Sequence, residues 1–239
     1  MPGKALEVQY LYHSGFLVKE ENRAYVFDYY PGTAETGPDI LLPEQFQELE
    51  LTVFVSHSHY DHFTRELFSW RGRVPRISYV ASSDVPVAGG EDLLKIGPNE
   101  ERGFRGLKIT TLKSTDEGVA FLLDTGKSVL YHAGDLNWWR WDGESEAYNR
   151  QMEWDYKDQV DLLKGMSLDA AFVPLDPRLE ENYLLGIDYF CRTVSAKAVF
   201  PMHFGDDYRV FRWLDGDSRA EEYRDRIKRI SRRGERFDV

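Results

Sequence analysis

The stretch VFVSHSHYDHF, residues 53–63, holds three of the six histidines of the chain and an aspartate within six positions. It overlaps the apolar run LTVFVS, which is typical of a strand buried on both faces. Because side chains alternate along a strand, an extended backbone points His57 and His59 the same way. Asp61 and His62 break this rhythm, so the chain must turn here and can present all four groups to one small volume.

Imidazole and carboxylate groups together suit zinc, manganese or iron, so this motif predicts a divalent metal site. We expect zinc, with manganese and iron as alternatives. Four ligand-type side chains within six residues exceed what one tetrahedral ion usually takes from one segment, which favours two neighbouring ions. A chance cluster of polar side chains on the surface is the alternative interpretation.

The other histidines also lie at the ends of predicted strands. His132 and Asp135 occur in VLYHAGD, His203 occurs in VFPMHFGDD, and His13 ends VQYLYH. Strand ends of a layered α/β protein converge into functional sites. We therefore predict Asp135 and His203 as metal ligands. For His132, direct ligation and a supporting role beside the ligands are both open, and for His13 we favour a supporting role or a hydrogen bond in the core.

The order of the predicted elements indicates an α/β protein with a single domain over residues 1–239. Paired strands are expected over residues 6–28, and further strands follow before the helical pattern begins. Residues 144–165 carry apolar side chains at steps of three and four, and from there helices and strands alternate. The basic segment 224–236 has the pattern of an amphipathic helix with its charges in solvent. The chain length of 239 residues fits one large domain.

The composition argues against several classes of protein. The net charge of -11 repels phosphate backbones, so we do not expect nucleic-acid binding. The apolar runs are strand-sized and fall short of the roughly 20 residues of a membrane helix. The start MPGKALEVQY lacks the apolar segment of a secretory signal, and Cys191 is the single cysteine, so a reducing, cytoplasmic location is expected. A homo-oligomer is compatible with this composition.

These motifs resemble those of the metallo-β-lactamase superfamily. The resemblance rests on HSHYDH at residues 57–62, Gly-Asp at residues 134–135 and His203, in that order, and it covers nearly the whole chain. The segments YHSGF, YHAGD and FPMHF look closest to the broad-specificity hydrolases that include ascorbate-6-phosphate lactonase. The resemblance implies a four-layer αββα sandwich with a metal site between its two sheets, along one edge.

The resemblance also implies a set of ligands. A first ion would be bound by His57 and His59, a second by Asp61, His62 and His203, and Asp135 would bridge the two ions. Family members usually supply a further histidine to the first ion from a strand end before the Gly-Asp motif. Here that stretch reads TTLKSTDEGVAF and contains no histidine.

Lys113 falls where this ligand is expected, and a protonated lysine cannot bind a metal ion. Asp116, Ser114 or His132 could take over the position, or the first site is weak and the protein works with one ion. In another interpretation, Lys113 holds an anionic group of the substrate. A metal-free protein without activity is a further alternative.

The activity that these residues predict is metal-assisted hydrolysis of a small, anionic substrate, either a lactone or other ester or a phosphoester. A bound ion lowers the pKa of water to about 7 and polarises the group under attack. Asp61 would orient this water or accept its proton, and His203 would stabilise the leaving oxygen if it is not a ligand. The alternatives are a nuclease-type phosphodiesterase of the same superfamily and a non-catalytic regulatory protein that binds metal.

Two segments supply candidates for substrate binding. In LNWWRWDGE, directly after Asp135, Trp138 and its neighbouring tryptophans could form a wall of the pocket or only cover the core, and Arg140 could meet an anion. In PLDPRLEENY, Asp176 and Arg178 lie in a loop that follows another predicted strand.

Overall fold

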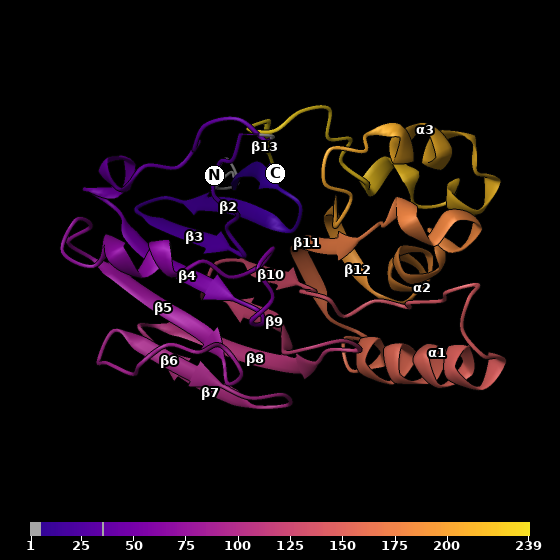
Figure 1. Cartoon of the computed structure of the whole chain (residues 1–239), viewed down its shortest axis with the longest axis horizontal. Coiled ribbons are helices and arrows are strands. Elements are labelled where there is room, and N and C mark those ends of the chain that lie inside the picture. Colours follow the sequence, from indigo (N-terminus) through magenta and orange to yellow (C-terminus); the bar gives the residue numbers. More distant parts are fainter. Residues whose placement is uncertain (1–5, 35) are drawn as a thin grey trace.

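The computed structural model describes residues 6–34 and 36–239. Two β-sheets pack against each other through a common apolar core, and three α-helices lie beside strands β11 and β12 (Figure 1). The arrangement of two mixed sheets flanked by helices confirms the predicted four-layer sandwich.

The first sheet has the strand order β13-β1-β2-β3-β4-β5-β6. Its strands are β1 (Glu7–Tyr12), β2 (Gly15–Glu20), β3 (Arg23–Phe27), β4 (Glu50–Val55), β5 (Ile77–Ser82), β6 (Leu93–Ile96) and β13 (Arg236–Asp238). The antiparallel series β1 to β3 confirms the paired strands predicted over residues 6–28. Strand β4 lies between two parallel neighbours, β3 and β5, and this position explains the apolar run before the histidine motif.

The second sheet has the strand order β12-β11-β10-β9-β8-β7. Its strands are β7 (Glu101–Phe104), β8 (Leu107–Lys113), β9 (Val119–Asp124), β10 (Val129–His132), β11 (Ser167–Pro174) and β12 (Ser195–Met202). Strands β10, β11 and β12 are parallel to one another, so their carboxyl ends meet at one edge of the sheet. Such an edge is where open α/β sheets bind ligands.

The α-helices are α1 (Glu146–Asp161), α2 (Leu185–Thr193) and α3 (Arg209–Gly216). Helix α1 confirms the helical pattern predicted over residues 144–165, and the Ser145 side chain caps it by accepting a hydrogen bond from the Tyr148 amide. Five short 3-10 helices complete the structure: η1 (Pro43–Phe46), η2 (Arg65–Trp70), η3 (Pro177–Asn182), η4 (Ser218–Ala220) and η5 (Arg224–Arg226). Phe46 and Trp70 pack on the outer face of the first sheet, so that layer is formed by 3-10 helices and loops.

The prediction for the basic segment 224–236 is wrong. It forms the single 3-10 turn η5, an irregular stretch and the start of β13 instead of an amphipathic helix. Its arginines are used in tertiary contacts, since Arg226 donates to the Cys191 carbonyl and Arg233 to the Leu11 carbonyl. Long-range hydrogen bonds of this kind override local helix propensity. No helix in the described ranges has the length and hydropathy needed to span a membrane.

Candidate metal centre

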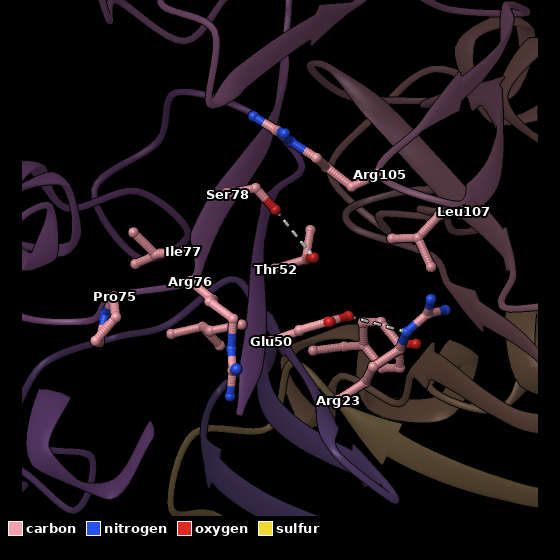
Figure 2. A pocket seen from close by; sticks show the side chains of 11 residues that line it. Arg23, Glu50, Thr52, Pro75, Arg76, Ile77, Ser78, Arg105 and Leu107 are labelled. Atoms are coloured by element: carbon pink, nitrogen blue, oxygen red, sulfur yellow. Dashed lines mark hydrogen bonds and ion pairs between the residues drawn. The ribbon is translucent and has the colours of Figure 1, made fainter. Parts of the chain in front are cut away.

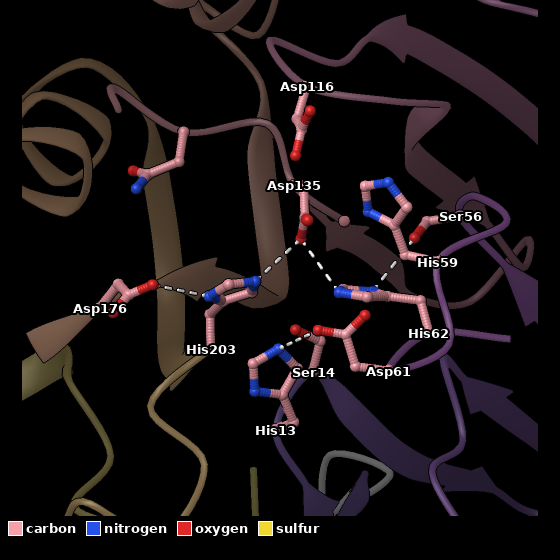
Figure 3. Close-up of polar contacts among 12 residues, drawn as sticks. His13, Ser14, Ser56, His59, Asp61, His62, Asp116, Asp135, Asp176 and His203 are labelled. Atoms are coloured by element: carbon pink, nitrogen blue, oxygen red, sulfur yellow. Dashed lines mark hydrogen bonds and ion pairs between the residues drawn. The ribbon is translucent and has the colours of Figure 1, made fainter. Parts of the chain in front are cut away.

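Separate strand ends bring the predicted ligands together (Figure 3). His13 follows β1, residues 57–62 follow β4, and His203 follows β12. Asp135 lies three residues beyond the end of β10. These residues are distant in sequence, yet they line one buried volume between the two sheets.

Asp135 lies at the centre of this cluster. Its Oδ1 atom is 3.2 Å from His62 Nε2 and 3.3 Å from His203 Nε2, and its Oδ2 atom is 3.4 Å from His57 Nε2. Two ligand atoms on one tetrahedral zinc ion, each at roughly 2.0–2.2 Å, lie roughly 3.3–3.6 Å apart. Asp135 Oδ1 and His62 Nε2 are buried and lack a hydrogen-bond partner among the described residues. Because buried polar atoms normally have partners, these contacts fit the shared coordination of a cation.

The donor atoms fall into three overlapping groups, in each of which all atoms lie within 4.8 Å of one another. The groups are His13, Asp61, His62 and His203; His57, His62 and Asp135; and His59, Asp116 and Asp135. The imidazoles of His57 and His59 also approach each other, with 3.1 Å between Nε2 and Nδ1. All six ligands predicted from the sequence therefore belong to one cluster, whose donor atoms suit a divalent metal ion.

Asp116 lies where the sequence lacks the expected histidine. Its carboxylate forms one group of donor atoms with His59 and Asp135. Its amide donates a hydrogen bond to the Ser114 hydroxyl at 3.1 Å. Lys113, by contrast, is exposed at the end of β8 and does not line the cavity at the centre. Its amide donates to Gln159 Oε1 of helix α1. The structure thus places an acidic side chain at the site and leaves Lys113 outside the cavity, which does not favour the interpretation that Lys113 holds an anionic group of the substrate.

His132 supports the site without facing it. Its Nε2 atom donates to the Ser14 carbonyl at 2.8 Å, and its Nδ1 atom accepts a hydrogen bond from the Gly134 amide at 3.2 Å. The ring stacks on Phe27 with 5.0 Å between centroids. Both ring nitrogens are engaged, so of the two open interpretations the structure favours the supporting role.

Two buried carboxylates hold ligand imidazoles from behind. Asp28 accepts hydrogen bonds from His62 Nδ1 at 2.8 Å and from the amide and hydroxyl of Ser56 at 2.8 and 2.6 Å. Asp176 accepts a hydrogen bond from His203 Nδ1 at 2.9 Å. Such contacts fix the ring orientation, so that Nε2 faces the centre, and increase the basicity of the ligand. Asp176 was predicted to bind substrate, and the structure corrects this role because its side chain is buried behind His203.

The sequence reasoning missed Asp28. The only signal was an acidic residue that follows directly after the apolar strand AYVF, as Asp135 follows soon after VLYH. It also missed Glu117, whose Oε2 atom lies 3.5 Å from His59 Nε2 in the loop after β8.

The charges of the cluster are strongly coupled. Burial disfavours protonation of His203, but the carboxylates of Asp135 and Asp176 outweigh it and raise the pKa of His203 to about 9. Burial also opposes the charge of His62, yet Asp135 and Asp28 raise its pKa well above the usual value. For His13, burial and the nearby His203 lower the pKa to about 4. Acidic side chains and the imidazoles of His62 and His203 therefore favour each other's charged forms.

The backbone at the centre is strained. His13, Asp28 and His203 have φ angles of 54°, 40° and 68°, a region that costs residues other than glycine about 1–3 kcal/mol each. Gly134, which precedes Asp135, has a φ angle of 54°, and a Cβ atom there would lie 2.8 Å from Ser56 Cβ. The Gly-Asp motif thus reflects close packing of this loop against the end of β4.

The centre opens into a cavity of about 310 Å³. Trp139, Trp141, Tyr148, Met152 and Arg178 line it together with members of the His/Asp cluster. Arg178 is held by the Asp176 carboxylate through its Nε and one terminal nitrogen, which keeps its guanidinium near His203. Trp139 is fixed by a 2.9 Å hydrogen bond from its Nε1 atom to the Asp135 carbonyl.

Two predicted substrate-binding residues lie outside this cavity. Trp138 does not line it and packs against the ammonium group of Lys157, 4.4 Å from its ring centroid. Arg140 does not line it either and forms a 2.6 Å ion pair with Glu146. The neighbouring rings of Trp139 and Trp141 form the wall instead.

A family model described as "Beta-lactamase superfamily domain" matches residues 7–147, which include the histidine motif and the Gly-Asp motif. The chain belongs to the metallo-β-lactamase superfamily. A search of curated proteins gives no significant match.

Solved structures show the superfamily fold over the full length of the chain. A metallo hydrolase from Ignicoccus hospitalis is 14% identical, with a TM-score of 0.63 and 98% of each chain covered. The metallo-β-lactamase fold protein YhfI from Bacillus subtilis is 12% identical, with a TM-score of 0.61 and coverage of 99% of this chain and 100% of that one. The diiron β-hydroxylase CmlA from Streptomyces venezuelae is 12% identical, with a TM-score of 0.59, and covers 100% of this chain and 54% of its own.

Proposed function

We propose that this protein is a metal-dependent hydrolase of a small, anionic substrate. The observation that carries the proposal is the position of Asp135, whose carboxylate lies within 3.2–3.4 Å of three imidazoles at the base of a cavity. A divalent ion held there would lower the pKa of a water molecule to about 7 and polarise the group under attack. Zinc fits the imidazole and carboxylate donors, and manganese and iron are the alternatives.

Asp61 is the residue that we assign to the positioning of water. Its side chain is partly exposed to the cavity, and one oxygen lies 3.3 Å from His13 Nε2. Burial opposes its ionisation, but His13 and His62 hold the pKa of Asp61 well below the usual value. The carboxylate therefore stays ionised at neutral pH and can hold a water molecule in place by accepting a hydrogen bond from it.

Arg178 is the residue that we assign to substrate binding. Among the described residues that line this cavity it is the single lysine or arginine, and it lies on the same side as His203. A guanidinium binds carboxylate or phosphate through paired hydrogen bonds. Trp139 and Trp141 are nearly parallel, with 6.2 Å between centroids, and offer an apolar wall for the rest of the substrate.

The size of the cavity limits the class of substrate. A volume of about 310 Å³ lies at the lower end of the range for small-molecule sites. This supports a small lactone, another ester or a phosphoester, in line with the resemblance to the lactonase branch. A nuclease would need a long cationic groove, which neither the single arginine of the cavity nor the net charge of -11 favours.

The test is turnover by protein stripped of metal and reloaded separately with zinc, manganese or iron. The substrates are p-nitrophenyl acetate, a γ-lactone, p-nitrophenyl phosphate and bis-p-nitrophenyl phosphate. Asp135→Asn should remove both bound metal and turnover, whereas Asp225→Asn, the same change on the exposed turn η5, should leave both unchanged. Stoichiometric metal binding without turnover of any substrate would contradict the hydrolase and support a regulatory metal-binding protein.

A further inference from the structure

A second cavity, of about 420 Å³, lies at the opposite end of the sandwich. Figure 2 shows it from close by. It is lined by the first residues of β3, β4 and β5 and by the turn between β7 and β8. The metal centre lies beyond the other ends of β3 and β4. The two cavities have no lining residue in common, so a molecule in the second cavity would not contact the metal ligands.

A row of three hydroxyl groups forms part of this cavity. Tyr25, Thr52 and Ser78 are register neighbours on β3, β4 and β5, and they are only 1%, 5% and 6% exposed. The hydroxyls of Thr52 and Ser78 are 3.1 Å apart. The Tyr25 hydroxyl is buried between the side chains of Arg23 and Glu20, which both interact with it. Each hydroxyl can make more than one hydrogen bond, so the row offers further hydrogen-bonding capacity to a molecule in the cavity.

The cavity is cationic although the chain is acidic. Arg23, Arg76 and Arg105 line it together with one acidic residue, Glu50, which gives the lining a formal charge of three minus one, or +2. The whole chain carries -11. The buried carboxylate of Glu20 also lies close to Tyr25 but does not line the cavity. A local excess of positive charge on such a protein favours an anionic ligand.

Arg23 is paired with Glu50 at 3.4 Å, whereas the other two arginines have donors to spare. Arg76 donates from one terminal nitrogen to the Glu48 carbonyl, and Arg105 donates from one to the Glu91 carbonyl at 2.9 Å. Each guanidinium carries five N–H donors in a planar fork, so these contacts use a minority of them. Figure 2 shows the hydrogen-bonded Thr52 and Ser78 at the centre of the cavity with the arginines around them.

Arg105 occupies a conformation that arginine disfavours. It forms the two-residue turn between β7 and β8 together with Gly106, and their φ angles are 51° and 75°. Two-residue hairpin turns with positive φ at both positions prefer Asn-Gly or Asp-Gly. A Cβ atom on Gly106 would lie 3.4 Å from a terminal nitrogen of Arg23, so the turn packs closely on that guanidinium. Backbone strain at a residue that lines a cavity is typical of a binding site.

We propose that this cavity binds a small molecule with a phosphate or carboxylate group on an apolar body. The guanidiniums and the hydroxyl row would hold the anionic group, and the side chains of Pro75 and Leu107 would contact the apolar part. The volume of about 420 Å³ suits such a ligand. The inference is independent of the hydrolase proposal, because it uses none of the metal-centre residues.

The test is calorimetric titration of the metal-loaded protein with phenyl phosphate, benzoate and the neutral analogue benzyl alcohol. Arg105→Asn supplies the side chain that the turn prefers and removes the guanidinium. We expect it to weaken anion binding by at least tenfold while the melting temperature stays the same or rises. Thr52→Val removes a hydroxyl at nearly constant shape and should also weaken binding. Arg102→Ala, a neighbouring exposed arginine that pairs with Glu100, is the charge-matched control and should have no effect.

Hydrogen exchange locates the bound anion, because the metal centre can also attract one. Protection of residues 50–52 and 76–78 supports the proposal, and the comparison of phenyl phosphate with benzoate identifies the preferred anion. The proposal is overturned if protection is confined to residues 57–62 and 113–118, if Arg105→Asn binds as tightly as the parent, or if benzyl alcohol binds as tightly as the anions.

Discussion

Asp28 and His62 are 34 residues apart in sequence, yet Asp28 Oδ2 accepts a 2.8 Å hydrogen bond from His62 Nδ1 in the fully buried interior. The same carboxylate accepts two further hydrogen bonds from Ser56. One buried acidic group therefore fixes both the end of β4 and the ring that faces Asp135.

Asp28→Asn tests this link. An amide keeps the shape but sets an N–H group against donors, so we expect the free energy of unfolding to fall by about 1–3 kcal/mol. Loss of this support should weaken metal affinity by about 10- to 100-fold. Competition with a chromophoric chelator measures the affinity, and denaturant unfolding measures the stability. An unchanged affinity would show that His62 needs no support from Asp28.

Alanine substitutions of Asp116 and Lys113 should differ in their effect on metal content. Asp116→Ala should lower the metal content of the purified protein, because it removes a donor from the group around His59. Lys113→Ala should leave metal content and turnover unchanged, because that side chain is exposed away from the cavity. Elemental analysis and a turnover assay decide both. Loss of turnover in Lys113→Ala at full metal content would restore the substrate-binding role predicted from the sequence.

The sequence predicted the ligands better than their supports. Few functions other than metal binding explain the imidazoles and carboxylates of HSHYDH, Asp135 and His203. The apolar strands before these residues placed them at strand ends. Asp28 could not be recognised, since a lone acidic residue after a strand is also typical of a turn. Which of Trp138 and Trp139 faces the cavity depends on the path of one loop, which periodicity does not determine. The helix predicted over the basic segment 224–236 does not form, because arginines of this segment donate hydrogen bonds to carbonyls that are distant in sequence.

The metal-free protein should lose stability as the pH rises from about 6.5 to 9. The pKa of His203 in the folded state is about 9, against an ordinary value of about 6.5. Its ion pairs with Asp135 and Asp176 contribute fully below pH 6.5 and are lost as the pH passes through 9. His62 contributes with the same sign, whereas His13, with a pKa of about 4, does not titrate in this window.

Metal binding needs these imidazoles without their protons, so metal affinity should increase over the same pH range. Thermal unfolding of the metal-free and zinc-loaded protein, together with chelator competition between pH 6 and 9, measures both trends. A metal affinity that is flat across this range would contradict the assignment of His203 as a ligand.

The position of Gly118, beside the histidine motif, has no space for a side chain. It has a φ angle of 68°, and a Cβ atom there would lie 2.0 Å from the Ser56 carbonyl oxygen and 2.5 Å from His57 Cβ. Gly118→Ala should therefore push apart the loop after β8 and the histidine motif, and we expect it to cost more than about 3 kcal/mol of stability. Gly103→Ala is the matched control, because nothing lies within 4 Å of a Cβ atom at that position of β7. It should change stability by less than about 0.5 kcal/mol. Denaturant unfolding compares the two, and equal stabilities would show that the loop can move away from His57 at little cost.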